Sequence, residues 1–242
     1  MGVAYSKAQN DRDTVSKRVL EELRLHIILN QYPKGSRLLE LELSKKYSAS
    51  RGTIRSALQE LANEGLVEFT ETGGCLAVGL DEKTLTDIYD FRCRLELHAA
   101  EILLTDRPFS VLGMMQILDE FLQKEGNPLY QTNPEEFYID LDMRFHQALV
   151  YAAQNRPVYR AWCALAEVIR MLMRFNLGDD YRITFQERFF TNHKAILDHA
   201  LLKDPALLDD IRNHFNSAVE VSKRQLALLQ QSPEMVQAFE VT

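Results

Sequence analysis

Apolar side chains recur at every fourth position near the start of the chain, at Val15, Val19, Leu23 and Ile27. This repeat places them on one face of an amphipathic helix, which the pattern predicts over residues 13–30. Pro33 and Gly35 interrupt the pattern and end this helix. A second, short helix is expected around residues 39–47.

The next helix is marked at both of its ends. Ser50 is a typical N-cap residue, and Gly65 is typical of the position that follows a helix C-terminus, so a helix is predicted from residue 51 to about Glu64. Two β-prone runs follow, "LVEFT" and "CLAV", and Gly73 and Gly74 lie in the turn between them, which favours a hairpin. Three helices and a hairpin are the plan of a winged helix-turn-helix domain.

Beyond Leu80 the chain shows only helical periods. We expect six helices, over residues 82–104, 109–125, 134–154, 156–176, 181–203 and 205–230. Six helices joined by short connections predict an antiparallel bundle. The expected fold class is therefore mainly α. A winged helix-turn-helix domain is expected at residues 1–79, an all-helical domain at 80–242 and a hinge at 78–82.

Charge is distributed unevenly between these two parts. The 242-residue chain has a formal net charge of −7. Residues 1–80 hold 11 Lys and Arg against 10 Asp and Glu, a net of +1, and the remainder holds 17 against 25, a net of −8. No acidic residue occurs from Leu43 to Gln59, a stretch that contains Lys45, Lys46, Arg51 and Arg55. An acidic body with one basic window indicates that the N-terminal part alone contacts a polyanion.

This basic window overlaps the helix predicted after Ser50. On a helical wheel its apolar face comprises Ile54, Ala57, Leu58 and Leu61. The opposite face is small and polar, and is made of Gly52, Ser56 and Gln59, with Arg51 and Arg55 at its edge. Such a face suits the DNA major groove, because glycine permits close approach, arginine reaches phosphates or guanine edges, and acids would repel the duplex. The alternative is a solvated helix face whose charge bias has no function.

The stretch "YPKGSRLLELELSKKYSASRGTIRSALQELANEGLVEF" resembles the DNA-binding domain of the GntR family of bacterial transcription regulators. The positions that match the family pattern are Pro33, Gly35, Leu38, Glu40, Leu43, Ser50, Arg51, Arg55, Ala57, Leu58, Leu61, Glu64, Gly65, Leu66 and Val67. The resemblance implies DNA contacts by Ser50, Arg51, Thr53 and Arg55, beside Gly52, and a wing around Gly73 and Gly74 in the minor groove. Departures at Gly52, Ser56 and Thr72 bear on the operator sequence and the wing contact.

Three of the predicted bundle helices carry polar side chains on their apolar faces. "DMRFHQAL" places Asp142 and His146 one turn apart, and His193 and His214 lie on the inward sides of two later helices. A carboxylate that faces a core is costly unless it is paired or bound to a metal. One aspartate and three histidines can form a cation site with open positions for water or a ligand. The alternative for each histidine, taken singly, is a hydrogen-bonded core residue.

The runs "IYDFRCRLELHAA", "DMRFHQAL", "NHKAILDHALLKD" and "IRNHF" resemble, in this order, the FCD-type ligand-binding domain of the FadR branch of GntR regulators. The resemblance implies that the metal ligands are Asp142, His146, His193 and His214. It also implies that Arg92 pairs with an effector carboxylate, the alternative being a salt bridge with Glu96, four residues later. Zinc is the expected metal, because three imidazoles and one oxygen suit it, with nickel or manganese as alternatives.

These features together predict a homodimeric transcriptional regulator, a repressor, that binds a pseudo-palindromic DNA operator. A small organic acid bound beside the metal is expected to control its operator affinity. The rival interpretation is a metal-dependent hydrolase or lyase. The sequence argues against an enzyme because it contains neither paired carboxylates nor a second metal cluster. The three cysteines lack any CxxC pair, which indicates reduced thiols and a cytoplasmic location. The apolar runs are too short to span a membrane.

Overall fold

The structure is a computed structural model that describes residues 2–176 and 179–231, and the side chains of residues 15–174 and 188–228. These residues fold into two compact units. The first ends at Asp81 and includes the end of the last helix from Leu228, and the second runs from Glu82 to Ala227. The division falls two residues after the boundary expected at 79/80.

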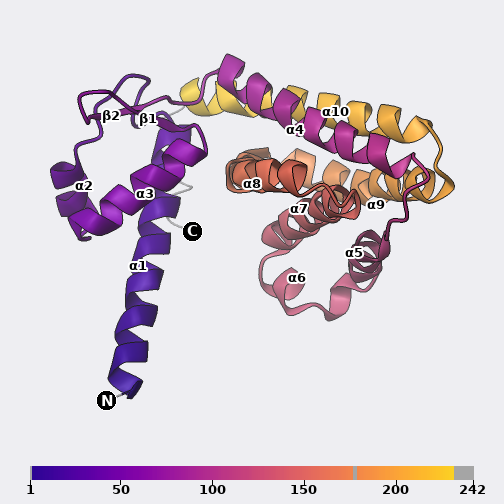
Figure 1. Ribbon diagram of the computed structural model, residues 1–242, viewed down its shortest axis with the longest axis horizontal. Helices are drawn as coiled ribbons and strands as arrows, with labels where there is room; N and C mark the ends of the chain where they lie inside the picture. Colours follow the sequence, from indigo (N-terminus) through magenta and orange to yellow (C-terminus); the bar gives the residue numbers. More distant parts are fainter. Residues whose placement is uncertain (1, 177–178, 232–242) are drawn as a thin grey trace. The chain divides into compact units, whose positions relative to one another are not determined.

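The first unit contains three helices and a hairpin (Figure 1): α1 (Gly2–Ile28), α2 (Glu40–Lys46), α3 (Arg51–Asn63), β1 (Val67–Phe69) and β2 (Cys75–Ala77). α1 buries the face that the four-residue repeat predicted, since Val19, Leu23 and Ile27 are all fully buried. The expected start of this helix at residue 13 was wrong. α1 begins at Gly2, because neither proline nor glycine occurs from residue 3 to residue 28 to stop it.

The ends of α3 are those that the sequence indicated. The Ser50 side chain accepts a hydrogen bond from the backbone N–H of Thr53, and Gly65 adopts a φ of 78°, the left-handed conformation that ends many helices. Arg24 of α1 donates two hydrogen bonds to Glu64, of 2.6 and 2.8 Å, and both side chains are buried. This bidentate ion pair fastens α1 to the end of α3.

The second unit is helical throughout its described part. Its elements are α4 (Glu82–Leu103), α5 (Leu112–Leu122), the 3-10 turn η1 (Lys124–Gly126), α6 (Pro128–Thr132), α7 (Pro134–Ala152), α8 (Arg156–Asn176), α9 (Asp179–Leu202) and α10 (Ala206–Gln231). The sequence analysis did not predict η1 or α6, and the helix expected to reach residue 125 ends at Leu122. α6 starts because Asn127 caps the backbone N–H groups of Leu129 and Tyr130.

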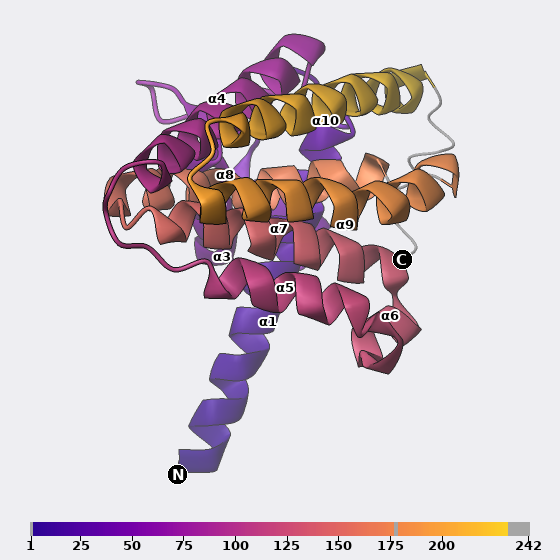
Figure 2. The same ribbon diagram turned by 90° about the vertical axis from the view of Figure 1, so that its right-hand side faces the viewer.

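α7 is the central helix of this unit and packs against α4, α5, α6, α8 and α9. α4 and α10 lie side by side in both views (Figures 1 and 2), and the hydroxyls of Tyr89 on α4 and Ser222 on α10 are hydrogen-bonded at 2.9 Å. The inward side of α7 therefore faces several helices at once. Polar groups on that side meet neighbours from distant parts of the sequence.

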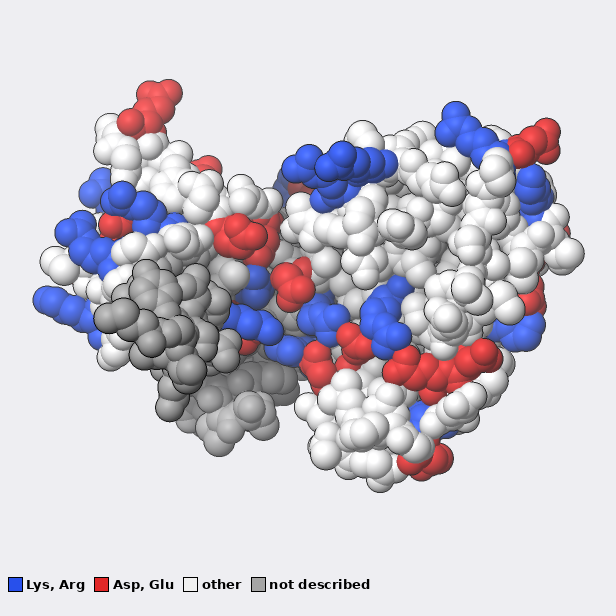
Figure 3. All heavy atoms as spheres, turned by 60° about the horizontal axis from the view of Figure 1, so that its bottom comes forward, with Lys and Arg blue, Asp and Glu red and all other residues white. Residues whose placement is uncertain are grey.

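The surface of the second unit carries both signs of charge. Figure 3 shows blue and red side chains intermixed on its visible face. Arg144 pairs with Glu120 and Asp140, at 2.8 and 3.0 Å, and Arg170 pairs with Glu136 at 2.9 Å. Among the described residues, no helix is long and apolar enough to cross a bilayer.

Candidate metal centre and nucleic-acid interface

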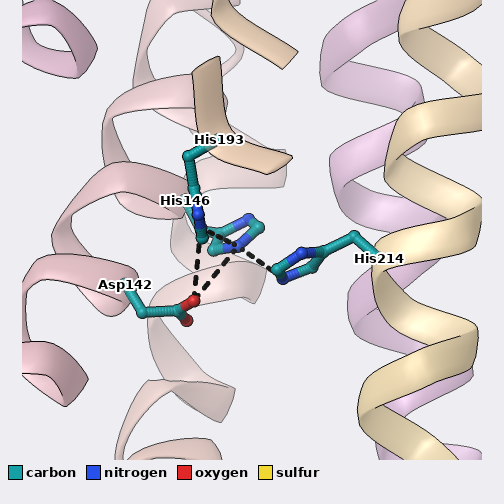
Figure 4. Close-up of side chains that lie close together, drawn as sticks. All are labelled: Asp142, His146, His193 and His214. Atoms are coloured by element: carbon teal, nitrogen blue, oxygen red, sulfur yellow. Dashed lines mark hydrogen bonds and ion pairs between the residues drawn. The ribbon is translucent and has the colours of Figure 1, made fainter. Parts of the chain in front are cut away.

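Four titratable side chains from three helices meet inside the second unit (Figure 4). Asp142 and His146 project from α7, His193 from α9 and His214 from α10, and their ligand atoms all lie within 4.8 Å of one another. The first three are buried, with exposed fractions of 3%, 0% and 1%, and His214 is partly exposed. The structure thus brings together all four residues that the sequence placed in one metal site.

The spacing of these atoms fits a shared cation. The Nε2 atom of His146 lies 3.1 Å from that of His214 and 3.3 Å from that of His193, and the Nε2 atom of His193 lies 3.2 Å from Oδ1 of Asp142. Two donors that bind one zinc ion tetrahedrally at about 2.0–2.1 Å are about 3.3 Å apart. Three imidazole nitrogens and one carboxylate oxygen are also the donor types that first-row divalent metals take.

Two of the imidazole rings are held so that the Nε2 atom faces the centre. His146 Nδ1 lies 2.6 Å from Oε2 of Glu96, and His193 Nδ1 lies 2.7 Å from the backbone oxygen of Phe189. Because an ionised carboxylate and a carbonyl only accept, each Nδ1 carries the proton and donates it. The two Nε2 atoms then present lone pairs to each other, an arrangement that a cation between them stabilises.

The electrostatics of the site favour the protonation states that bind metals. Burial alone raises the pKa of Asp142, but the neighbouring His146 and His193 outweigh it and hold this pKa far below its usual range. Burial lowers the pKa of His214 well below its usual value, and the nearby His146 and His193 lower it further. An ionised carboxylate and a neutral imidazole are the forms that ligate.

Arg92, for which the sequence left two roles open, lies next to this cluster. Its Nε atom donates to Glu96 at 3.0 Å, which is the salt bridge of the alternative interpretation. Its Nη2 atom is buried, no described residue forms a hydrogen bond with it, and it lies 3.9 Å from Oδ2 of Asp142. A buried donor that lacks a partner is costly, so a ligand acceptor at this position would be stabilised.

The second candidate site is the exposed face of α3. The side chains of Arg51 and Arg55 are 66% and 70% exposed, and Gly52 is exposed between them. The Ser50 hydroxyl is already engaged, since it accepts from the Thr53 backbone and lies 2.9 Å from the Thr53 hydroxyl. Gly73 and Gly74 are exposed in the hairpin turn, where Gly73 has a φ of 80°.

The structure corrects one expectation about this face. The sequence analysis explained the absence of acids from the window by repulsion from the duplex, yet Glu40, at the start of α2, contacts both arginines. Its carboxylate lies 2.8 Å from Nε of Arg55 and 3.6 Å from Nη2 of Arg51. The stretch from Leu43 to Gln59 therefore lacks acids in sequence, but in the structure the turn between α2 and α3 brings Glu40 against its arginines.

Comparison with known families identifies these two units. Residues 87–217 match the FCD domain, and residues 15–76 match the gntR family of bacterial regulatory proteins. The chain belongs to the GntR family of transcriptional regulators with an FCD domain. The described part of this regulator is mainly helical with a two-stranded sheet, as the sequence predicted.

Several relatives of this GntR-family regulator carry functional names. The gluconate operon transcriptional repressor of Bacillus subtilis is 28% identical over 79% of this chain and 77% of its own. Its counterpart from Bacillus licheniformis is 29% identical over 84% of this chain and 83% of its own. Both relatives are named as transcriptional repressors, and neither name indicates the hydrolase or lyase of the alternative interpretation.

Solved structures share the fold. One is described as Lar, which controls expression of the Listeria monocytogenes agr system. It superposes with a TM-score of 0.66 at 16% identity, over 86% of this chain and 96% of its own. A GntR regulator from Rhodococcus sp. RHA1 gives a TM-score of 0.57 at 20% identity, over the same shares of the two chains.

Sequence reasoning missed the role of two residues around the four-residue cluster of this GntR-family regulator. Glu96 entered only as a salt-bridge partner of Arg92, whereas it also accepts from His146 and, at 2.8 Å, from Nε1 of Trp162. Its place one turn after Arg92 was the available signal for Glu96. No local signal marked Trp162, which is 66 residues from Glu96.

The remaining histidines of the regulator pair outside the centre. His26 contacts the Tyr47 hydroxyl at 2.6 Å, His98 contacts Glu101 at 3.4 Å, and His199 contacts Asp210 at 2.6 Å. None of the three belongs to the four-residue cluster.

Proposed function

We propose that this regulator is a repressor that binds a pseudo-palindromic DNA operator as a homodimer, through α3 and the hairpin turn. A small organic acid would control operator affinity by binding beside a divalent metal ion held by Asp142, His146, His193 and His214. Zinc is the metal proposed, with nickel or manganese possible where water or effector fills further positions. The repressor assignment follows the names of the two gluconate operon relatives.

The observation that carries the effector proposal is the buried Nη2 atom of Arg92 at the edge of the four-residue cluster, where it lies 3.9 Å from Asp142 and no described residue accepts a hydrogen bond from it. When bound, the cation would supply a positive charge that attracts an anion. A dication with one carboxylate and three neutral imidazoles has a formal charge of about +1, while Arg92 and Glu96 cancel each other. A carboxylate matches both this charge and the free donor of Arg92.

The proposed effector site is connected to the DNA-binding unit through helix α4. Arg92 and Glu96 lie on α4, which begins at Glu82, the first residue of the second unit. A ligand that binds Arg92 therefore contacts α4, the first helix after the hairpin of the DNA-binding unit. It changes operator affinity only to the extent that it binds one arrangement of the two units better than the other.

The dimer and the location are also proposed. Helix-turn-helix repressors bind two half-sites with two copies, which is the reason to expect a homodimer. Cys75, Cys93 and Cys163 are free thiols in the structure, which fits a reducing cytoplasm.

The test combines metal analysis with operator titration. Wild type, His193→Ala, His214→Ala and a control, His98→Ala, are analysed for bound metal. Each is then titrated with the DNA upstream of its gene, with and without acetate, lactate, succinate, citrate or gluconate. We expect both site variants to lose metal and the response to acids while still binding DNA, and the control to match wild type. Full metal content in both site variants would refute the site.

A second outcome separates the effector role from a purely structural metal. If chelation unfolds the second unit and no acid changes DNA affinity of the metal-loaded protein, the metal serves the fold alone. Circular dichroism of chelated and metal-loaded protein makes this distinction. The effector part of the proposal would then fail, while DNA binding would stand.

A further inference from the structure

Glu40 forms a close ion pair with the DNA-facing arginine Arg55. Its two carboxylate oxygens accept from Nε and Nη2 of Arg55, at 2.8 and 3.2 Å, so the contact is bidentate. The partners lie 15 residues apart, on α2 and α3. Arg51 approaches the same carboxylate more loosely, at 3.6 Å. The side chain of Glu40 is 22% exposed, whereas that of Arg55 is 70% exposed.

Glu40 and Arg55 favour each other's charged form. The hydrogen bond from Arg55 lowers the pKa of Glu40 below its ordinary value, and the same bond raises the pKa of Arg55. Both groups are therefore charged at neutral pH. Exposed ion pairs of this kind contribute little to folding.

The contact leaves one edge of the guanidinium available. Glu40 occupies the side formed by Nε and one N–H of Nη2, and no described residue takes Nη1. The free end of the Arg55 guanidinium still offers the N–H groups of Nη1 and the second N–H of Nη2. Two donors side by side match the O6 and N7 acceptors of guanine in the major groove.

We propose that Glu40 is a positioning residue that braces Arg55 so that the free end of its guanidinium reads a guanine in each half-site. This inference rests on the proposed DNA-binding role of α3. Arg51, at the first position of α3 and held only loosely, takes a backbone phosphate, which carries no base preference.

The brace and plain electrostatics predict opposite results for Glu40→Gln. An acid near the duplex repels phosphate, so electrostatics alone predicts that removing it strengthens binding to every DNA sequence. A brace predicts that the variant loses its preference for guanine at one position, because Arg55 is no longer fixed. Glu42 lies in the same first turn of α2 and is exposed, so Glu42→Gln removes the same charge without touching Arg55.

The experiment uses the full chain and a random pool of DNA duplexes. Wild type first selects its preferred duplex, and each G·C pair is then replaced in turn by A·T and titrated by gel shift. We expect one replacement per half-site to weaken wild type and Glu42→Gln by about tenfold, the discrimination typical of one bidentate contact. For Glu40→Gln the same replacement should change affinity by less than about twofold, while binding to unselected DNA is equal or tighter.

Two further variants keep the inference refutable if Glu40→Gln folds poorly. Glu40→Asp keeps the charge but shortens the reach, so guanine preference should fall without tighter binding to unselected DNA. In an Arg55→Lys background, where no guanidinium is present to make a bidentate contact, Glu40→Gln should leave base preference unchanged. Undiminished guanine preference in Glu40→Gln or Glu40→Asp would overturn the brace. Failure of wild type to select any sequence would overturn the proposed function, and the brace with it.

Discussion

The Glu96→Gln variant tests whether one buried carboxylate supports both the bundle and the proposed metal centre. Glu96 is fully buried and accepts from Arg92 at 3.0 Å, Trp162 at 2.8 Å and His146 at 2.6 Å. Glutamine has nearly the same shape, but it has no charge and only one of its terminal atoms accepts. The substitution therefore leaves Arg92 buried without its close counter-ion.

Two considerations give the magnitude of the stability that Glu96→Gln should lose. Breaking a buried ion pair by removing one partner costs about 3–5 kcal/mol. Burial alone raises the pKa of Glu96, but the neighbouring His146 and Arg92 outweigh it and lower this pKa from 4.5 to about 2. That difference between unfolded and folded states corresponds to about 3 kcal/mol of stability. Because the folded-state pKa is the lower one, the stabilisation is present above about pH 4.5 and is lost as the pH falls towards 2.

The same substitution should weaken metal binding. If the glutamine amide faces His146, it donates to Nδ1, which must then accept, and the ring proton moves to Nε2. That nitrogen no longer offers a lone pair to the cation. Loss of such a supporting hydrogen bond typically reduces metal affinity by about 10–100-fold.

The assay uses Trp162, the one tryptophan of the sequence, which is bonded to Glu96 and reports on the site directly. Urea unfolding of chelated wild type and Glu96→Gln is followed by its fluorescence, and metal affinity is measured by competition with a chelating dye. Glu101→Gln, an exposed acid on the same helix, is the control. Equal unfolding midpoints and equal metal affinity for wild type and Glu96→Gln would show that the carboxylate supports neither.

Three further predictions concern DNA, pH and assembly. Arg51→Ala and Arg55→Ala should each weaken operator binding by about 1–3 kcal/mol in gel shifts with the fold intact, and a double variant with wild-type affinity would contradict the interface. Metal affinity should fall at acidic pH, because His146, His193 and His214 ligate only when neutral, and dialysis against zinc at a series of pH values measures this. The full chain should sediment as a dimer at micromolar concentration, and a monomer there would rule out the proposed pairing.

Helix boundaries were predictable wherever a local signal set them. Ser50 and Gly65 bound α3 because capping depends on residues next to each other in sequence. Asn127–Pro128 is the same Asn-Pro signal as Asn133–Pro134, so α6 was readable in principle, but its five residues are too short to show an apolar period. The start of α1 at Gly2 was missed because the four-residue apolar repeat begins only at Val15.

The sequence by itself determined which side chains face inward, because helical periodicity is a local property. It therefore placed Asp142, His146, His193 and His214 on buried faces before any contact was known. Only the tertiary structure decided that they meet, since His146 and His214 are 68 residues apart and the packing of α7 against its neighbours brings them together.

The tertiary structure also decided what restrains the functional residues. Glu96 fixes the His146 ring across 50 residues, and Glu40 folds back onto an arginine that follows it by 15. Neither pairing follows from periodicity, because each depends on the distance and angle between two helices. Those are set by the whole packed interface and by no single stretch of the chain.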